Sequence, residues 1–425
     1  KTMKKIALTF ALLICVTSAF GQRKAVNQAS RDVLVEKPDF KALRNTMKEA
    51  LVHEESMNDA KTWYVAGEIE RTYFEQQNML KQIGKEAKDK DMYNALIKSY
   101  EYYNRALALD TLPNEKGKVK PKYTKKIVAA VKKNIDGFSN GGLYFYNNQE
   151  YKKAYKIWKI FCEIPSVPVF TEKGREGLPA DSVVEQVEFY GALAALQTGD
   201  HKLAIKALKA ARKNTYEKNN IYKYLVNEYE ILQDTAQIIK TLNEAEKECQ
   251  DILVEEKQAD GSVIMKKENI YTLKLINIFI NRGEYDKAIA KLDEVLASDP
   301  ENIDYLNVKG GLYENQKNDD LAIECYQKAV DLNPENPSSL SNLGRMYFNQ
   351  AIEKNEEISS EKSNSVYEKR RAEEVLPLFK KALPYYEKAH KISPDEREYM
   401  IALRGIYYNL NMPKEQKAIE TEMGY

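Results

Sequence analysis

Lysine, asparagine and arginine residues recur at positions that helical phase places on one face of successive expected helices. Such side chains bind carboxylates and peptide groups through charge and hydrogen bonds, and they need no cofactor to do so. The spacing therefore predicts a surface that binds another protein or a peptide. Its candidate residues are Lys223, Asn227, Lys274, Asn277, Asn307 and Arg345.

A second group of amides lies at the ends of the same helices. Asn281, Asn315 and Asn349 recur at one constant interval, and Asn147 occupies the equivalent position earlier in the chain. A ladder of amides could hydrogen-bond an extended peptide backbone. Asparagine is also common where a helix ends, and we favour this capping role over binding.

Residue types that are typical of catalysis or metal binding do not cluster in the sequence. The three histidines, His53, His201 and His390, lie far apart, and His53-Glu54-Glu55 lacks the second histidine of a zinc-binding helix. No P-loop, dinucleotide-binding or Gly-x-Ser-x-Gly motif occurs. We therefore predict that the protein is not an enzyme and holds neither a cofactor nor a metal ion.

The candidate residues lie on expected helices, and the pattern of residue types in two such helices occurs twice within Ile270–Pro334. Ala288 returns as Ala322, and Pro300 returns as Pro334 at the same separation. Two antiparallel helices approach closely only where a side chain is nearly absent, and proline ends a unit because it cannot continue a helix. One helical hairpin cannot bury its apolar face alone. The sequence therefore predicts an all-α fold, an α-solenoid of stacked helical hairpins.

The residue types within one unit resemble the tetratricopeptide repeat. That family places a small residue, an aromatic residue three positions later, Ala-x-x-x-aromatic in a second helix and a closing proline at an interval of about 34 residues. Here these positions hold Gly310, Tyr313, Ala322, Tyr326 and Pro334. The resemblance implies a right-handed superhelix whose concave face, lined by the first helix of each hairpin, binds protein partners.

The wider layout resembles the exported tetratricopeptide proteins of Bacteroidota. The resemblance rests on Leu378–Tyr386 and Leu403–Tyr408 within a split penultimate repeat and the chain's ending, and it covers most of the mature chain. It implies a scaffold in the cell envelope, but that group shares no ligand that could be transferred. The family's clamp for a peptide C-terminus is not assigned, because Lys274 stands where an asparagine is expected.

The first residues have the three parts of a secretory signal peptide. Met3-Lys4-Lys5 precede an apolar run from Ile6 to Phe20, which is shorter than the roughly 20 residues of a membrane-spanning helix. We expect cleavage after Gly21 and a periplasmic mature protein without a transmembrane segment, with association to the outer membrane as an option.

The mature chain is nearly neutral. The expected signal peptide holds three of the 65 basic residues and no acidic one, which leaves 62 basic and 64 acidic residues. Because no net positive charge remains, nucleic acid is not an expected partner.

The repeat positions and the insertions between them divide the chain into six parts. They are a signal peptide at 1–21, a leader and a degenerate split repeat at 22–134, central repeats at 135–250, an insertion at 251–268, C-terminal repeats at 269–394 that an insertion at 351–376 splits, and capping helices at 395–425. Within the second part, Gln22–Pro38 is expected to be extended or mobile.

Three insertions have distinct chemistry. Asp260-Gly261 between apolar runs predicts a small β-hairpin near residues 252–266, although the preceding helix could instead continue to Glu256. Pro165–Ser182 contains several turn residues and is expected to be a surface loop. Pro113–Lys126 is rich in lysine; it could bind an anionic surface, but a solvated loop is favoured.

These observations favour a non-enzymatic scaffold that holds an extended segment of another protein in its concave face. The alternative is a glycan-binding protein associated with the outer membrane, which would need aromatic rings on its surface. Trp63 and Trp158 fall in core positions of repeats instead. The oligomeric state does not follow from the pattern.

Overall fold

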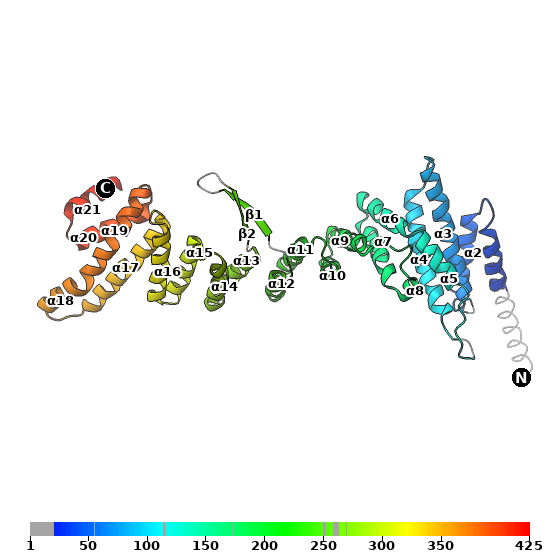
Figure 1. The fold of residues 1–425 in the computed structure, drawn as a ribbon, viewed down its shortest axis with the longest axis horizontal. Helices are drawn as coiled ribbons and strands as arrows, with labels where there is room; N and C mark the ends of the chain where they lie inside the picture. The colour runs from blue at the N-terminus through cyan, green and yellow to red at the C-terminus, as the bar shows by residue number, and fades with distance from the viewer. Residues whose placement is uncertain are drawn as a thin grey trace, which may run out of the picture. The chain divides into compact units, whose positions relative to one another are not determined.

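The computed structural model describes residues 21–54, 56–113, 116–172, 174–249, 252–257, 263–268 and 270–425. The expected signal peptide lies almost entirely outside these residues. The chain divides into two compact units, Lys1–Thr241 and Leu242–Tyr425, and both consist mainly of antiparallel helical hairpins (Figure 1). The all-α solenoid architecture that the repeat spacing predicts is therefore confirmed.

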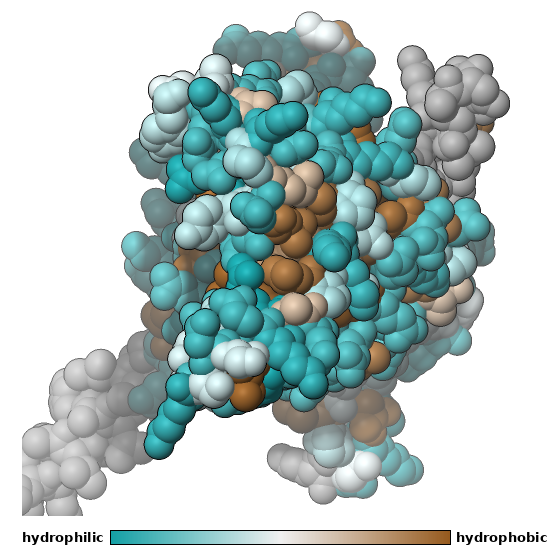
Figure 2. All heavy atoms as spheres, turned by 90° about the vertical axis from the view of Figure 1, so that its left-hand side faces the viewer, coloured by the Kyte–Doolittle hydropathy of each residue, from teal (hydrophilic) through white to brown (hydrophobic). Residues whose placement is uncertain are grey.

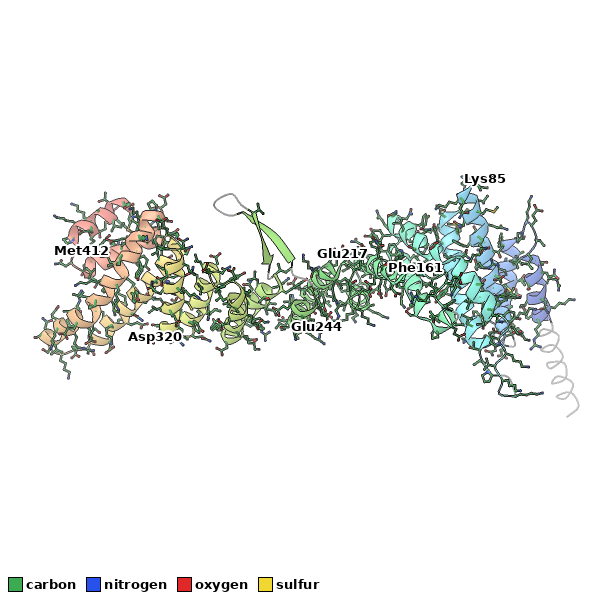
Figure 3. All side chains as sticks on the ribbon, in the orientation of Figure 1. Lys85, Phe161, Glu217, Glu244, Asp320 and Met412 are labelled. Atoms are coloured by element: carbon green, nitrogen blue, oxygen red, sulfur yellow. The ribbon has the colours of Figure 1, made fainter. Side chains whose placement is uncertain are left out.

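The N-terminal unit contains a helix over residues 21–32 and then a series of longer and shorter helices. These are α2 (Phe40–Ala50), α3 (Ala60–Gln82), α4 (Asp89–Asp110), α5 (Thr124–Lys133), α6 (Ile135–Asn147), α7 (Tyr151–Glu163), a 3-10 turn (Ile164–Ser166), α8 (Pro168–Thr171), α9 (Asp181–Gln197), α10 (His201–Ala211) and α11 (Lys218–Ile231). The longest pair, α3 and α4, is joined by a turn that contains Lys85 (Figure 3).

Two expectations for this unit were wrong. Gln22–Pro38 is not an extended leader, because residues 21–32 are helical, and Val26 and Ala29 of this helix, with Val33 directly after it, are buried against α2 and α3. These three apolar residues lie three or four positions apart, which is the spacing of one helix face. Pro165–Ser182 is not simply a loop, since Phe170 in the short helix α8 is buried in the core.

Helix α12 (Thr235–Glu248) contains the boundary between the units, and a β-hairpin follows it. The remaining elements are β1 (Ile252–Lys257), β2 (Val263–Glu268), α13 (Ile270–Asn281), α14 (Tyr285–Ser298), α15 (Ile303–Asn315), α16 (Asp319–Leu332), α17 (Pro337–Ile358), α18 (Asn364–Arg370), α19 (Leu376–Ile392), α20 (Arg397–Asn409) and α21 (Pro413–Glu422). Strands β1 and β2 pair antiparallel from Ile252 with Glu268 to Lys257 with Val263, which confirms the expected hairpin. Its Asp260-Gly261 turn lies outside the described residues.

The small residues of the repeat mark helix crossings, as predicted. Ala288, Ala322 and Ala382 are fully buried. At Gly310, an added Cβ would lie 2.5 Å from Cε1 of Tyr326, so α15 and α16 approach at a distance that only glycine allows. Filling such a contact forces neighbouring side chains off their rotamers, and the Gly310–Tyr326 contact therefore sets the geometry of this hairpin.

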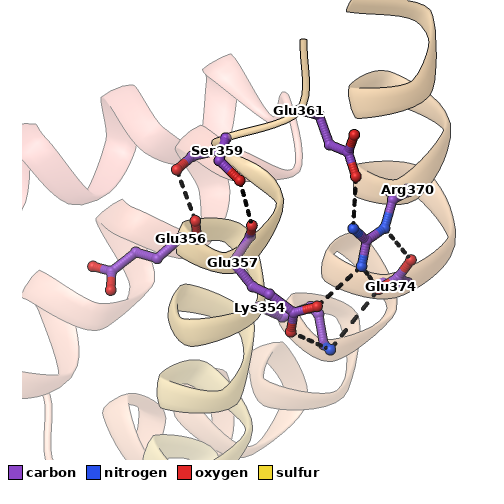
Figure 4. A network of polar contacts seen from close by, with 8 residues as sticks. Lys354, Glu356, Glu357, Ser359, Glu361, Arg370 and Glu374 are labelled. Carbon is purple, nitrogen blue, oxygen red and sulfur yellow. Dashed lines mark hydrogen bonds and ion pairs between the residues drawn. The ribbon is translucent and has the colours of Figure 1, made fainter. Parts of the chain in front are cut away.

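After α17 the chain turns at Ser359–Ser363 and continues as α18, and these two helices form an arm. Arg370 closes this arm by donating to three carboxylates, those of Glu357 at 3.1 Å, Glu361 at 2.8 Å and Glu374 at 2.8 Å (Figure 4). One turn of π-helix, Arg371–Val375, then leads into α19. The insertion expected at residues 351–376 is therefore helical over most of its length.

The turns between the two helices of a repeat share one backbone conformation. Most contain a residue in the left-handed region that is followed by an N–H closing the helix in a Schellman motif; for example, Asn318 N donates to Tyr313 O at 2.9 Å. The left-handed residues of these turns include Gln149 (φ 60°), Gln233 (55°), Gly283 (69°), Lys317 (59°) and Asn411 (57°). Because glutamine and lysine are not typical turn residues, the sequence patterns did not reveal this conformation.

We predict that Lys317→Gly stabilises the protein. A side chain in the left-handed region is strained and glycine is not, so the gain should be about 0.5–1 kcal/mol after the larger entropy of the unfolded glycine is included. Gly283→Ala, at the equivalent turn, should lose a similar amount. Chemical denaturation monitored by circular dichroism measures both changes. A change in the free energy of unfolding that has the same sign in both variants would contradict the shared turn conformation.

Candidate functional site

The structure distributes the six predicted binding residues over four helices and both units. Lys223 and Asn227 lie exposed on α11 in the N-terminal unit. The other four lie in the C-terminal unit, with Lys274 and Asn277 on α13, Asn307 on α15 and Arg345 on α17. Of these, the structure joins Asn307 and Arg345, which are linked through a residue that the sequence patterns did not identify.

That residue is Asn342 on α17, and it connects the first helices of two consecutive hairpins. Asn342 Nδ2 donates to Asn307 Oδ1 at 3.4 Å, and Asn342 Oδ1 accepts from Arg345 Nη2 at 3.2 Å. Asn307 Nδ2 in turn donates to the fully buried Ser339 Oγ at 2.8 Å. The two predicted residues therefore belong to one hydrogen-bond network, which holds their side chains in fixed orientations.

The network continues from Arg345 into the helix crossing. Arg345 forms an ion pair with Glu314 on α15, and Glu314 Oε2 accepts from Tyr326 OH at 3.2 Å. Burial tends to lower the pKa of Arg345, but the hydrogen bond and charge of Glu314 outweigh it and raise this pKa. The charge of Arg345 is thus compensated within the protein, and a partner carboxylate would have to compete with Glu314 for it.

The same surroundings keep the Tyr326 hydroxyl protonated up to a higher pH than usual. Burial, followed by the neighbouring charge of Glu314, raises the pKa of Tyr326 from 10 to about 12. The ring also fills the space over Gly310. Tyr326 therefore connects the packing contact between α15 and α16 to the polar residues of the candidate surface.

The repeat register places exposed aliphatic residues at the same positions as these amides. Val308 on α15 occupies the repeat position that Asn342 occupies on α17, and Ile401 on α20 occupies the position of Asn307. Val308 is 41% exposed and Ile401 is 55% exposed. We call the surface formed by Val308, Asn342 and Ile401 the first-helix face, because each residue lies on the first helix of its hairpin. The pattern of polar residues that predicted the candidate site does not include Val308 and Ile401, although they follow the same repeat register.

Exposed apolar side chains also lie at the C-terminal end of the chain, where Tyr408 on α20 is 71% exposed. Helices α17 and α20 pack against each other, and a Cβ added at Gly405 would lie 3.4 Å from the ring of Phe348. Figure 2, which views this end of the molecule, shows apolar residues at the centre of the face with hydrophilic residues around them. An apolar centre with a polar rim is the arrangement found in protein interfaces.

The amides at the helix ends support the capping interpretation where their partners are visible. Asn315 Nδ2 donates to Gly311 O in its own helix at 2.8 Å. Asn409 Nδ2 donates to Gly405 O at 2.9 Å in the same way. These asparagines satisfy carbonyl groups in the last turn of a helix, which uses one N–H of each amide.

The histidines and other potential metal ligands remain dispersed. His201 Nδ1 lies 2.8 Å from Oε2 of the buried Glu228, and His390 lies 3.3 Å from Glu422. Within the described ranges, no group of three or more His, Cys, Asp or Glu residues is arranged to hold a metal ion. Within the same ranges, no helix is both long and apolar enough to cross a membrane.

Comparison with known proteins identifies one repeat family. Residues 273–337 match the family described as "Tetratricopeptide repeat". Among curated proteins, the photosystem I assembly protein Ycf3 of Rippkaea orientalis is 31% identical over 116 residues, which are 27% of this chain and 60% of that protein. Ycf3 of Prochlorococcus marinus is 34% identical over 70 residues, 16% of this chain and 40% of that protein. The chain thus spans between 40% and 60% of the length of these relatives.

Two similar solved structures are described as TPR repeat proteins. The C-terminal part of a TPR repeat-containing protein from Cytophaga hutchinsonii is 15% identical with a TM-score of 0.36, and the match covers 67% of this chain and 93% of that one. A TPR repeats protein from Bacteroides fragilis is 16% identical with a TM-score of 0.29, and the match covers 64% and 98% of the two chains.

We predict measurable coupling between Arg345 and Glu314. A double-mutant cycle with Arg345→Met and Glu314→Gln should give about 1 kcal/mol in the free energy of unfolding, because the pair is partly buried and held by neighbours. The exposed pair Lys159 and Glu163, which lies 3.2 Å apart on α7, is the matched control and should give about 0.3 kcal/mol. Indistinguishable coupling energies would contradict a structural role for the Arg345 ion pair.

We also predict that Tyr326 contributes to loss of stability at alkaline pH. Its folded-state pKa of about 12 exceeds the ordinary value of 10, so its stabilisation is complete below pH 10 and is lost as the pH rises towards 12. The difference in unfolding free energy between wild type and Tyr326→Phe should therefore shrink between pH 9 and pH 12. Denaturant titrations across this range measure that difference in unfolding free energy. A difference that stays constant with pH would refute the raised pKa of Tyr326.

Proposed function

We propose that this chain, which contains tetratricopeptide repeats, is a non-enzymatic scaffold of the cell envelope that binds an extended segment of another protein. The observation that carries the proposal is the first-helix face, where exposed Val308 and Ile401 accompany the hydrogen-bonded amide of Asn342. A repeated surface suits a partner that is itself extended, because such a partner can contact successive repeats in turn.

The chemistry of this face suits a peptide backbone with apolar side chains. The network orients the amides of Asn307 and Asn342, so a partner need not order them on binding. Covering the exposed parts of Val308 and Ile401 would contribute roughly 1–2 kcal/mol in total. Compensation of Arg345 by Glu314 makes an apolar and amide-based contact more favourable here than recognition of a free carboxylate.

The envelope location rests on the amino-acid sequence. Lysines followed by the apolar run Ile6–Phe20 and Gly21 form the pattern of an exported chain. The resemblance to exported Bacteroidota proteins supports the same location. A fusion of residues 1–30 to a reporter enzyme that is active only after export tests it, and retention of the reporter in the cytoplasm would refute export.

The relatives support a role in protein association. The curated relatives are named as assembly proteins of photosystem I. One similar structure, YrrB, is described as a TPR protein with an unusual peptide-binding site; it is 16% identical with a TM-score of 0.27, and the match covers 52% of this chain and 96% of that chain. We propose the general activity, association with another protein, without adopting the partners of these proteins.

The glycan-binding alternative has less support. A stacking platform for sugars needs exposed aromatic rings, whereas Trp158 is buried and donates from Nε1 to Ser139 O at 3.0 Å. Trp63 is half-buried and donates to Met57 O at 2.7 Å. A polysaccharide that shifts the intrinsic tryptophan fluorescence would favour this alternative.

Partner capture from envelope extract tests the scaffold with three forms of the chain. We expect the wild type to enrich a protein partner and the double variant Val308→Asp/Ile401→Asp to lose it, because buried charge without a pairing group is costly. Leu321→Asp on α16, a second helix of the same unit where Leu321 is 37% exposed, should retain it.

The captured protein is then divided into segments, and each segment is titrated against the three forms. The dissociation constant of the binding segment should rise on the order of tenfold or more in the double variant. Equal weakening by Leu321→Asp, or the absence of any partner above background, would refute the proposal.

A further inference from the structure

The connector between α4 and α5 has an unusual charge distribution. From residue 116 of this connector to residue 126 in the first turn of α5 there are six lysines and no acidic residue, whereas the whole chain is almost balanced at 65 basic and 64 acidic residues. Lysines occupy alternate positions at 116, 118, 120 and 122, and residues 118–121 adopt no helix or turn. Positive charge is therefore concentrated within a few residues of this connector.

The end of this connector forms one wall of a cleft in the N-terminal unit. The cleft has a volume of about 390 Å³ and is lined by Lys120 and Lys122 of the connector, Arg23 of the N-terminal helix, and residues at the start of α3 and the end of α4. All three basic side chains are exposed. Within the described residues, no carboxylate forms an ion pair with any of these three.

The acidic residues of the cleft are already engaged by the backbone. Asp110 accepts from Lys122 N at 2.9 Å, from Tyr123 N and Thr124 N at 2.8 Å, and from Thr124 Oγ1 at 2.8 Å. Asp59 accepts from Lys61 N at 2.9 Å and caps α3. Asp110 thus anchors the connector beside the cleft, and its oxygens are taken up by donors other than the lysine ammonium groups.

Further contacts hold the two walls of the cleft in place. The ring of Tyr123 stacks on Tyr64 of α3 with centroids 4.6 Å apart. Lys61 on α3 hydrogen-bonds Asn27 on the N-terminal helix, which positions the helix that carries Arg23. The basic side chains therefore extend from an ordered backbone, unlike those of a simple solvated loop.

Exposed aliphatic residues accompany the positive charge. Leu112 lines the cleft and is 59% exposed, and Val119 stands between two lysines and is 52% exposed. Basic residues interleaved with aliphatic ones are typical of surfaces that bind the headgroup region of a membrane, where lysines meet phosphates and aliphatic side chains enter the interface. A soluble polyanion would have no use for the aliphatic residues.

We propose that the cleft formed by Arg23, Lys120 and Lys122 binds the phosphate groups of an anionic lipid surface, with Leu112 and Val119 entering the interface. The guanidinium of Arg23 suits two phosphate oxygens at once, and the lysines act as point charges. This binding is separate from the first-helix face and does not depend on a protein partner. It would hold the scaffold at a membrane by its N-terminal unit.

Vesicle sedimentation with the chain from Gln22 onwards tests the proposal without the apolar run. We expect the chain to bind vesicles that contain phosphatidylglycerol and not vesicles of phosphatidylcholine alone, with weaker binding at higher salt. Lys120→Gln/Lys122→Gln should weaken binding on the order of 25-fold, since each basic residue near such a surface contributes about fivefold. Lys202→Gln/Lys206→Gln, which removes the same charge from exposed positions on α10, should bind as the wild type does.

Two further measurements separate the lipid from other sources of the same anion. Inorganic phosphate that shifts the resonances of cleft residues while vesicles fail to bind would assign the cleft to free phosphate and overturn the lipid proposal. Heparin binding without vesicle binding would overturn it in favour of a soluble polyanion. Equal weakening of vesicle binding by both double variants would show that net charge, and not this cleft, is responsible. Circular dichroism of each variant confirms that the fold is retained.

Discussion

The contact between a glycine in one helix and an aromatic ring in the next is the constraint on which the rest of the structure depends. A Cβ added at Gly67 would lie 2.5 Å from the ring of Tyr103, and one added at Gly142 would lie 2.1 Å from Trp158. The rings therefore occupy space that any other residue would need. Each ring fits its partner helix at only one position along the helix axis and one rotation about that axis. The contact therefore also determines which side chains face away from the crossing.

The hydroxyl groups of the crossing tyrosines extend this constraint to the charged residues. Tyr103 OH hydrogen-bonds Glu68, and Tyr326 OH hydrogen-bonds Glu314. Each carboxylate is also bound by an arginine, which is Arg71 of the same helix in one case and Arg345 of the next hairpin in the other. Charged residues near the crossings thus hold helices together, which leaves amides and aliphatic side chains available for a partner.

The two proposed surfaces differ in chemistry because they lie on different kinds of backbone. The first-helix face is built on regular helices, whose register repeats the same exposed positions from one hairpin to the next. The basic cleft is built where Asp110 anchors an extended connector, and it has no counterpart in the repeat. One surface suits an extended protein segment, and the other suits a layer of phosphate groups.

The sequence by itself determined the helical hairpins, because apolar and small residues repeat at intervals that report which side of each helix is buried. Ala288 and Ala322 are buried where the spacing predicted, and the Asp260-Gly261 signal led to the β-hairpin that strands β1 and β2 form. The same spacing did not predict the helix within residues 22–38, because that helix is short and carries few apolar residues.

Only the tertiary structure decided which polar side chains meet. The link from Asn307 through Asn342 to Arg345 crosses from one helix to another. Periodicity describes each helix about its own axis, whereas a hydrogen bond between helices depends on how far one is rotated and shifted against its neighbour. That relation is set by the packed rings, and it becomes visible only when the helices are assembled.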